Sequence, residues 1–184
     1  MRTLIALFFL AIAHAVEPAK PWPPVAFKYA VAYCYDFSQD PRGYSITFPD
    51  GSLHKGVIRA TTVRLTEAQV TKLRTLLSTD SKMEHGDVDC YDPHHAFVFY
   101  DADWKVTASI DVCFLCDDYA ARPKGTSDLI DLAALEAFCR EIGLPLLKDS
   151  PDYTALYRRE QPSAAPAKPK AEPSPSEQDD PFGP

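Results

Sequence analysis

Proline limits how much of this chain can fold. Seven of the 17 prolines lie in the final segment QPSAAPAKPKAEPSPSEQDDPFGP, which has few apolar side chains. Such a segment cannot bury enough surface to offset the entropy of ordering, so residues 160–184 are predicted to be a disordered tail. A second proline-rich stretch, VEPAKPWPP at 16–24, predicts an extended leader. A single domain is therefore expected over residues 25–159, which is long enough for one core.

The first residues have the pattern of a secretory signal peptide. Arg2 precedes an unbroken apolar run at 4–13, and Ala13 and Ala15 supply the small residues that a signal peptidase recognises. The run is about half of the roughly 20 residues needed to cross a bilayer. We expect residues 1–15 to be cleaved, with no integral membrane segment remaining. The protein is then exported, either periplasmic or extracellular.

The charge of the chain argues against two classes of partner. The formal net charge is −7, and the loss of Arg2 with the signal peptide would take it to about −8. The sequence contains no basic patch, which disfavours binding to nucleic acid and to anionic membrane surfaces. It indicates no particular ligand, partner or oligomeric state.

Strand patterns occupy three parts of the predicted domain. The aromatic-rich run at 27–37 predicts an N-terminal strand. The turn PDGS predicts a first hairpin from residues 44–48 and 53–60, because proline presets one backbone angle and glycine tolerates another. Residues 96–100 and 105–114 predict a second hairpin.

Two helices have clear start signals. Thr66 and Gln69 have the spacing of a capping box before the apolar-periodic segment TEAQVTKLRTLL. Asp131 is in position to cap LAALEAFCREIG, and Gly143 and Pro145 follow its end. Ser150-Pro151 predicts a short last helix that continues to Arg159.

The order of these elements predicts an α+β fold. We expect a small antiparallel sheet made of two hairpins and the N-terminal strand, with two helices packed on one face. Residues 78–93 form a long polar loop, and loops of this length in compact domains are often functional. Residues 117–127 are expected to be irregular.

The cysteines cluster around the second hairpin. The motif CYDPHH contains Cys90, His94 and His95, and CFLC contains Cys113 and Cys116. The remaining cysteines are Cys34 on the first predicted strand and Cys139 on an apolar helix face, where we expect a buried core thiol. Five cysteines in an oxidising compartment predict disulfides and leave at least one thiol that is free, intermolecular or metal-bound.

Pairing across the second hairpin brings the two motifs together. If the turn is centred at 102–103, paired residue numbers sum to 205 or 206. The sum 206 places Cys90 opposite Cys116 and His95 opposite Asp111, whereas 205 places His94 opposite Asp111. Apolar alternation favours 205. Both registers predict that Cys90, one histidine, Cys113 and Cys116 meet, and that Asp111 orients the histidine.

Three interpretations of this cluster are open. The favoured one is structural: Cys90 bonds Cys116 or Cys113 and clamps the long loop, with Cys34 available for a second bond. The second is a zinc or copper site with ligands drawn from Cys90, His94, His95, Cys113 and Cys116. The third is thiol–disulfide chemistry at Cys113 and Cys116, against which Asp117 and Asp118 argue because they would raise the thiol pKa.

The stretch from Cys90 to Pro145 resembles small exported bacterial proteins of no assigned function. The resemblance rests on C-x3-HH, FVFYD, C-F-x-C and a helix that ends in GLP. It implies export and assigns no catalytic residue. We therefore expect an exported, disulfide-stabilised binding or accessory module, with the metal and redox proteins as alternatives and no clear catalytic machinery.

Overall fold

The computed structural model describes residues 21–81 and 90–161, and every structural statement below concerns these residues. The predicted signal peptide at 1–15 lies outside them. So do the first residues of the predicted leader, part of the long polar loop, and the tail from residue 162.

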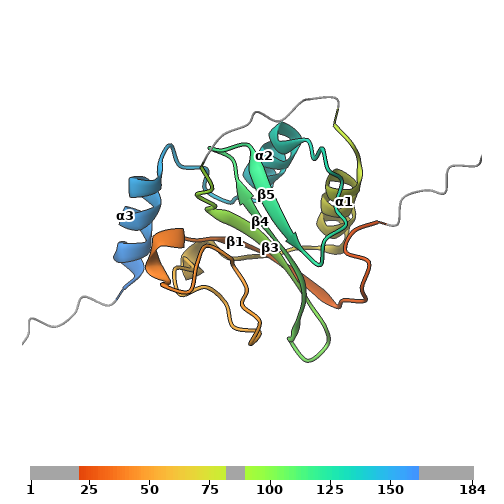
Figure 1. Cartoon of the computed structure of the whole chain (residues 1–184), viewed down its shortest axis with the longest axis horizontal. Coiled ribbons are helices and arrows are strands. Elements are labelled where there is room, and N and C mark those ends of the chain that lie inside the picture. The colour runs from red at the N-terminus through yellow and green to blue at the C-terminus, as the bar shows by residue number, and fades with distance from the viewer. Residues whose placement is uncertain (1–20, 82–89, 162–184) are drawn as a thin grey trace, which may run out of the picture.

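The described chain is an α+β domain built on one antiparallel sheet. Its five strands are arranged in the order β2-β1-β3-β4-β5 (Figure 1). Their bounds are β1 Tyr29–Cys34, β2 Val63–Arg64, β3 His95–Tyr100, β4 Val106–Cys113 and β5 Asp118–Arg122. The strand β3 is central, and every residue in it is buried.

Three α-helices accompany the sheet in the described residues: α1 Glu67–Ser78, α2 Leu132–Glu141 and α3 Ser150–Glu160. The predicted caps of α1 and α2 are confirmed. Thr66 and Gln69 form the reciprocal capping box of α1, and the Asp131 carboxylate accepts from the Ala134 amide at 2.8 Å. The last helix is also confirmed, with Asp149 as its cap. Two short 3-10 turns lie at Phe37–Gln39 and Arg59–Thr61.

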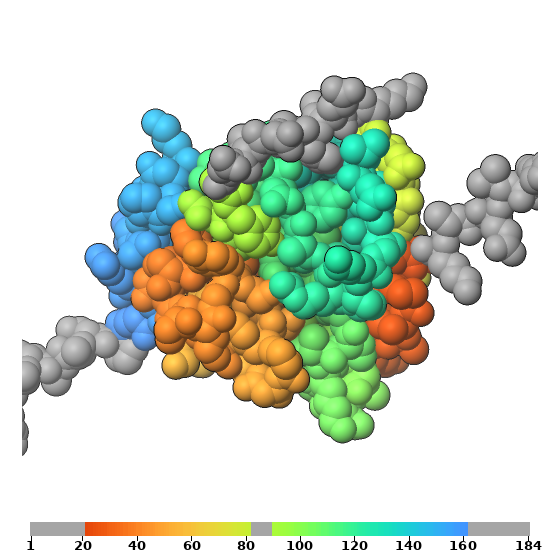
Figure 2. All heavy atoms as spheres, viewed as in Figure 1, coloured from red at the N-terminus to blue at the C-terminus, as the bar shows by residue number. Residues whose placement is uncertain are grey.

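The two faces of the sheet have different covers. Phe97 and Phe99 of β3 point to one face, where α1 and α2 close a core that includes Leu73, Leu135 and Phe138. The opposite face contributes Val31, Tyr33, Ala96, Val98 and Tyr100, and Tyr35 and Ile46 from the chain that follows β1 join them. Figure 2 shows that chain as a continuous surface beside the projecting β3–β4 turn.

The predicted first hairpin is wrong in extent. Residues 44–48 and 53–60 share the single bridge Thr47–Leu53 and contribute no strand to the sheet. Polar turns shape this segment instead: Asp40 accepts from the Arg42 and Lys55 amides. A carboxylate that bonds nearby backbone donors competes with strand pairing. The sheet is completed by β2 and β5, and β5 occupies part of the stretch predicted to be irregular.

Trp22 corrects the predicted start of the domain. Its side chain is fully buried, and its indole Nε1 donates to the Pro123 carbonyl at 2.9 Å. The Trp22 ring also lies edge-on to Phe99, with 5.4 Å between ring centroids. The packed domain therefore includes residues that the proline content assigned to an extended leader.

Both predicted registers of the second hairpin are wrong. Tyr100 pairs with Val106, which matches the sum 206, but Phe99 pairs with Ala108. Thr107 is thus an extra residue, and its hydroxyl donates to the Phe99 carbonyl. The bulge shifts every later pair by one. Beyond it the sum is 207, so Ala96 faces Asp111 and His95 faces Val112. The faces that the sum of 205 predicted are kept, because 205 and 207 differ by two, and Phe97 and Phe99 share a face with Ala108, Ile110 and Val112.

Candidate ligand-binding cavity

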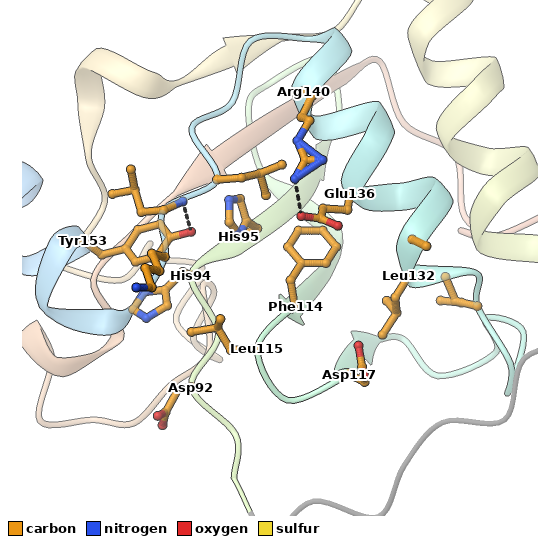
Figure 3. A pocket seen from close by; sticks show the side chains of 15 residues that line it. Asp92, His94, His95, Phe114, Leu115, Asp117, Leu132, Glu136, Arg140 and Tyr153 are labelled. Atoms are coloured by element: carbon orange, nitrogen blue, oxygen red, sulfur yellow. Dashed lines mark hydrogen bonds and ion pairs between the residues drawn. The ribbon is translucent and has the colours of Figure 1, made fainter.

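A cavity of about 390 Å³ lies beside the start of β3. Its walls come from β3, the turn after β4, helix α2, and the chain that joins α2 to α3 (Figure 3). This volume is at the lower end of the usual range for small-molecule sites. The lining residues are Asp92, His94, His95, Phe114, Leu115, Asp117, Ile130, Leu132, Ala133, Glu136, Arg140, Leu146, Leu147, Lys148 and Tyr153.

A disulfide closes one side of the cavity. Cys90 and Cys116 are bonded, with 5.8 Å between their Cα atoms. This is one of the pairings that the sequence predicted. Asp92 lies two residues after Cys90, and Leu115 and Asp117 flank Cys116. The disulfide therefore ties together two chain segments that both line the cavity.

The other cysteines in the described residues are free thiols. Cys34, Cys113 and Cys139 are all buried. Burial raises the pKa of Cys34 to about 12, and it also raises the pKa values of Cys113 and Cys139. Since the thiolate is the reactive form, a raised pKa makes each thiol a poor nucleophile. Cys139 lies in the apolar core, as predicted.

His94 connects the sheet to helix α3. Its Nδ1 lies 2.9 Å from the Tyr35 carbonyl, which can only accept, so Nδ1 carries the hydrogen. The Ser150 hydroxyl then donates to Nε2 at 3.0 Å. The Tyr153 ring is stacked on the imidazole with 3.8 Å between centroids. Ser150 and His94 have the separation of a nucleophile and its base, but Ser150 does not line the cavity.

His95 points to the opposite face of β3 and is almost fully buried. Its Nε2 donates to the Pro145 carbonyl at 2.9 Å. Burial lowers the pKa of His95 from 6.5 to about 4, so the ring is neutral near pH 7. Figure 3 shows it beside Tyr153 and Phe114 at the inner end of the cavity.

Asp111 lies on the other face of the sheet, away from this cavity. Its carboxylate accepts from the Ile46 amide at 2.8 Å, the Ser45 hydroxyl at 3.1 Å and the Arg122 guanidinium at 2.7 Å. Neither histidine is among its hydrogen-bond partners in the described structure. The register is the reason: Asp111 pairs with Ala96, two residues along β3 from His94, and the Asp111 carboxylate bonds the Ile46 amide instead.

The predicted zinc or copper ligands are not gathered at one point. Among residues 21–81 and 90–161, no three His, Cys, Asp or Glu side chains are close enough to hold a metal ion. Cys90 and Cys116 are bonded to each other, and each histidine bonds a backbone carbonyl. Cys113 forms a disulfide with neither Cys90 nor Cys116, so the Cys113–Cys116 pair of the redox interpretation is not bonded in this structure.

The outer part of the cavity carries charge. Glu136 and Arg140 of α2 form an ion pair at 2.6 Å, one helical turn apart. Figure 3 shows this pair at one side of the cavity and Asp92 and Asp117 at the other. Lys148 adds a second positive charge. Apolar side chains, including Phe114 and Leu132, form much of the rest of the wall.

Most of these wall residues were not expected from the sequence. Its pattern places Leu132 on the buried face of α2 but cannot show that Glu136 and Arg140 border a cavity. The segment LPLLK after α2 contributes Leu146, Leu147 and Lys148 to the wall. Its three leucines were the one sign in the sequence that this segment packs against the domain. Asp117, with a φ of 48°, marks a tight turn after β4.

No family model, curated protein or solved structure matches this chain. The likeness to small exported bacterial proteins therefore stays a prediction. In the part of the chain that the structure describes, none of the helices has the length and apolar content needed to cross a membrane.

Proposed function

We propose that this chain is an exported, disulfide-stabilised binding module whose ligand site is the cavity beside β3. The cavity itself carries the proposal: a chamber of about 390 Å³ whose wall combines apolar side chains with two histidines and several charged groups. Ligand sites commonly combine an apolar wall with a small number of polar groups that orient the ligand.

The chemistry of the cavity favours binding over catalysis. His94 and His95 both use a ring nitrogen to hold a backbone carbonyl, and burial lowers both pKa values. A general base works best with a pKa near the operating pH. The buried thiols have raised pKa values and are poorly suited to nucleophilic or redox work.

Filling the cavity tests the proposal. Ala133 lines it and is exposed on α2, so Ala133→Trp should occupy the space without disturbing the core. Ala137→Trp is the matched control, because Ala137 is exposed on the same helix and does not line the cavity. The oxidised protein is screened against small amphiphilic compounds by NMR, with the His95 and Leu132 amides as reporters.

The expected result is a set of compounds that shift these amides in the wild-type protein and in Ala137→Trp but not in Ala133→Trp. The absence of any such compound, or equal binding to both variants, would contradict the proposal.

The disulfide offers a second test with the same ligands. Cys90→Ser with Cys116→Ser removes the link between the segments that carry Asp92 and Asp117. We expect weaker binding and a loss of stability of about 3 kcal/mol, from a loop of 26 residues. Cys113→Ser removes a thiol outside the disulfide and keeps the Cys90–Cys116 bond, so the ligand affinity should not change. Unchanged affinity in the double variant would show that the disulfide does not shape the site.

Export is a separate part of the proposal. It is supported by the apolar run that follows Arg2 and by the small residues at 13 and 15. A fusion of residues 1–20 to a reporter that is active only outside the cytoplasm should be active, and the processed chain should begin at Val16. Replacing Leu10 with arginine interrupts the apolar run and should abolish reporter activity. An active Leu10→Arg fusion would argue against this signal.

A further inference from the structure

The polar groups of the cavity indicate what kind of polar group a bound ligand would carry. This inference rests on the proposed function, since it assumes that the cavity is a binding site. His95 provides the key observation: its side chain is 1% exposed and lines the cavity. Its Nε2 donates to the Pro145 carbonyl. Its other ring nitrogen, Nδ1, has no hydrogen-bond partner among the described residues.

The tautomer of His95 determines what Nδ1 can bind. A backbone carbonyl accepts and never donates, so the contact with Pro145 places the ring hydrogen on Nε2. Nδ1 then carries a lone pair and acts as an acceptor. Among the described residues the Tyr91 hydroxyl is the one fully buried side-chain polar atom without a partner, so Nδ1 is not such an orphan. As an acceptor on a residue of the cavity wall, Nδ1 would gain a hydrogen bond from a ligand that donates one.

Carboxylates at the outer part of the cavity favour the same kind of ligand. Asp92 and Asp117 line it and form no ion pair within the described residues. Arg140 is engaged by Glu136, which leaves Lys148 as the opposing charge. The acceptors therefore outnumber the unengaged cations, and a positively charged donor is favoured over an anion.

We infer that the cavity takes a small ligand that combines an apolar body with one protonated amine, whose N–H donates to His95 Nδ1 while the apolar body contacts Phe114, Leu132 and Tyr153. The charge is balanced by Asp92 and Asp117. A neutral alcohol can make the hydrogen bond but gains nothing from the carboxylates, and a carboxylate can make neither interaction.

Three ligands with the same aliphatic chain test this order by NMR titration: hexylamine, hexanol and hexanoate. We expect hexylamine to bind about tenfold more tightly than hexanol, because a hydrogen bond gains about 1.4 kcal/mol or more when one partner is charged. Hexanoate should bind most weakly. A tripeptide with one lysine presents the same ammonium from a polypeptide. If the tripeptide binds more tightly than hexylamine, the natural ligand is the amine of a peptide; if hexylamine binds more tightly, it is a free amine.

Variants identify the acceptors. His95→Gln keeps an N–H near Nε2 for Pro145 and loses the acceptor at Nδ1, so hexylamine binding should fall about tenfold. Asp117→Asn should cost about twofold to threefold, and it suits the positive φ of this position. Asp103→Asn, in the exposed β3–β4 turn away from the cavity wall, is the matched control and should bind like the wild type.

The outcomes separate the ligand class from the function. Hexanoate or hexanol binding as tightly as hexylamine would overturn the amine while leaving the cavity a binding site. Failure of all compounds in the wider screen would overturn the proposed function itself. If His95→Gln does not fold, the ¹⁵N resonance of Nδ1 in the wild-type protein decides. It should shift when hexylamine binds, and an unchanged resonance would exclude this hydrogen bond.

Discussion

One sheet in this molecule is covered in two different ways. Helices α1 and α2 cover one face with apolar side chains, such as Leu73, Leu135 and Phe138. The chain at 35–58 covers the other face, and buried polar groups help to attach it. Thr47 and Ser109 share a hydrogen bond of 2.7 Å, and Asp111 accepts from the Ile46 amide.

The difference teaches which forces hold each cover in place. An amphipathic helix gains its stability from burial, which is proportional to apolar area and insensitive to direction. A chain of turns has fewer apolar residues to bury, so hydrogen bonds with defined geometry must fix its position. Single substitutions should therefore act through lost volume on the helix face and through lost partners on the other face.

Neighbouring residues of β3 give the largest expected contrast. Phe97 points to the helices and Val98 to the chain at 35–58, and both are fully buried. Phe97→Ala should lower the free energy of unfolding by about 4 kcal/mol, and Val98→Ala by about 2 kcal/mol. Urea denaturation measures both. Equal losses would contradict the expectation that the side-chain volume removed sets the cost at these two fully buried positions.

The sequence could predict the helix side of this comparison. The period of Val70, Leu73 and Leu77, with Thr66 as a cap, indicates α1 without any knowledge of the rest. The class and the central hairpin follow from equally local patterns. So does a bond from Cys90 to Cys113 or Cys116, a choice that the sequence left open and the structure resolves as Cys116. Each of these signals lies within a few residues or at fixed spacing along a strand.

The cover at 35–58 and the cavity could not be predicted in this way. The Asp111 carboxylate accepts from the amide of Ile46, 65 residues earlier in the chain, and no periodic pattern in the sequence predicts this contact. One extra residue at Thr107 moved Asp111 opposite Ala96, two residues along β3 from the His94 that the favoured register had paired with it. The cavity depends on where α2, the 144–148 segment and the disulfide meet, which is a property of tertiary packing.

Asp111 gives the second largest effect and tests the polar cover. Asp111→Ala removes the shared acceptor of Ser45, Ile46 and Arg122, and the Ile46 amide is buried. We expect a loss of about 3 kcal/mol in the free energy of unfolding. Asp118→Ala is the control, because Asp118 is exposed on the neighbouring strand and should cost less than about 0.5 kcal/mol. Equal effects in the two variants would rule out the polar attachment.

The buried histidines give a pH-dependent effect of intermediate size. The pKa of His95 falls from 6.5 to about 4 on folding because burial disfavours the charged ring. Its contribution is complete above pH 6.5 and is lost as the pH falls toward 4, since the unfolded chain then binds the extra proton. From about pH 7 to about pH 5 we expect a loss of about 2 kcal/mol from this ring.

The measurement compares denaturation of the wild type and His95→Gln across this range. The difference between the two curves isolates His95, because all other titrating groups are present in both proteins. The subtraction is needed since Asp111 has a raised pKa and contributes to the pH dependence with the opposite sign. His54, on the loop-covered side, also has a pKa lowered by burial. His54→Gln therefore shows how much of the pH dependence arises on that side. A His95→Gln curve parallel to that of the wild type would contradict the neutral buried ring.

The smallest predicted effect lies on the exposed surface of α1. Thr66 accepts from the Gln69 amide, and the Gln69 side chain accepts from the Thr66 amide in return. Thr66→Ala should cost about 1 kcal/mol, because it leaves a helix N–H without its partner. Thr71→Ala, in the middle of the same helix, should change stability by less than about 0.5 kcal/mol. A cap effect as large as that of Asp111 would mean that local hydrogen bonds, rather than burial, determine how the helices cover the sheet.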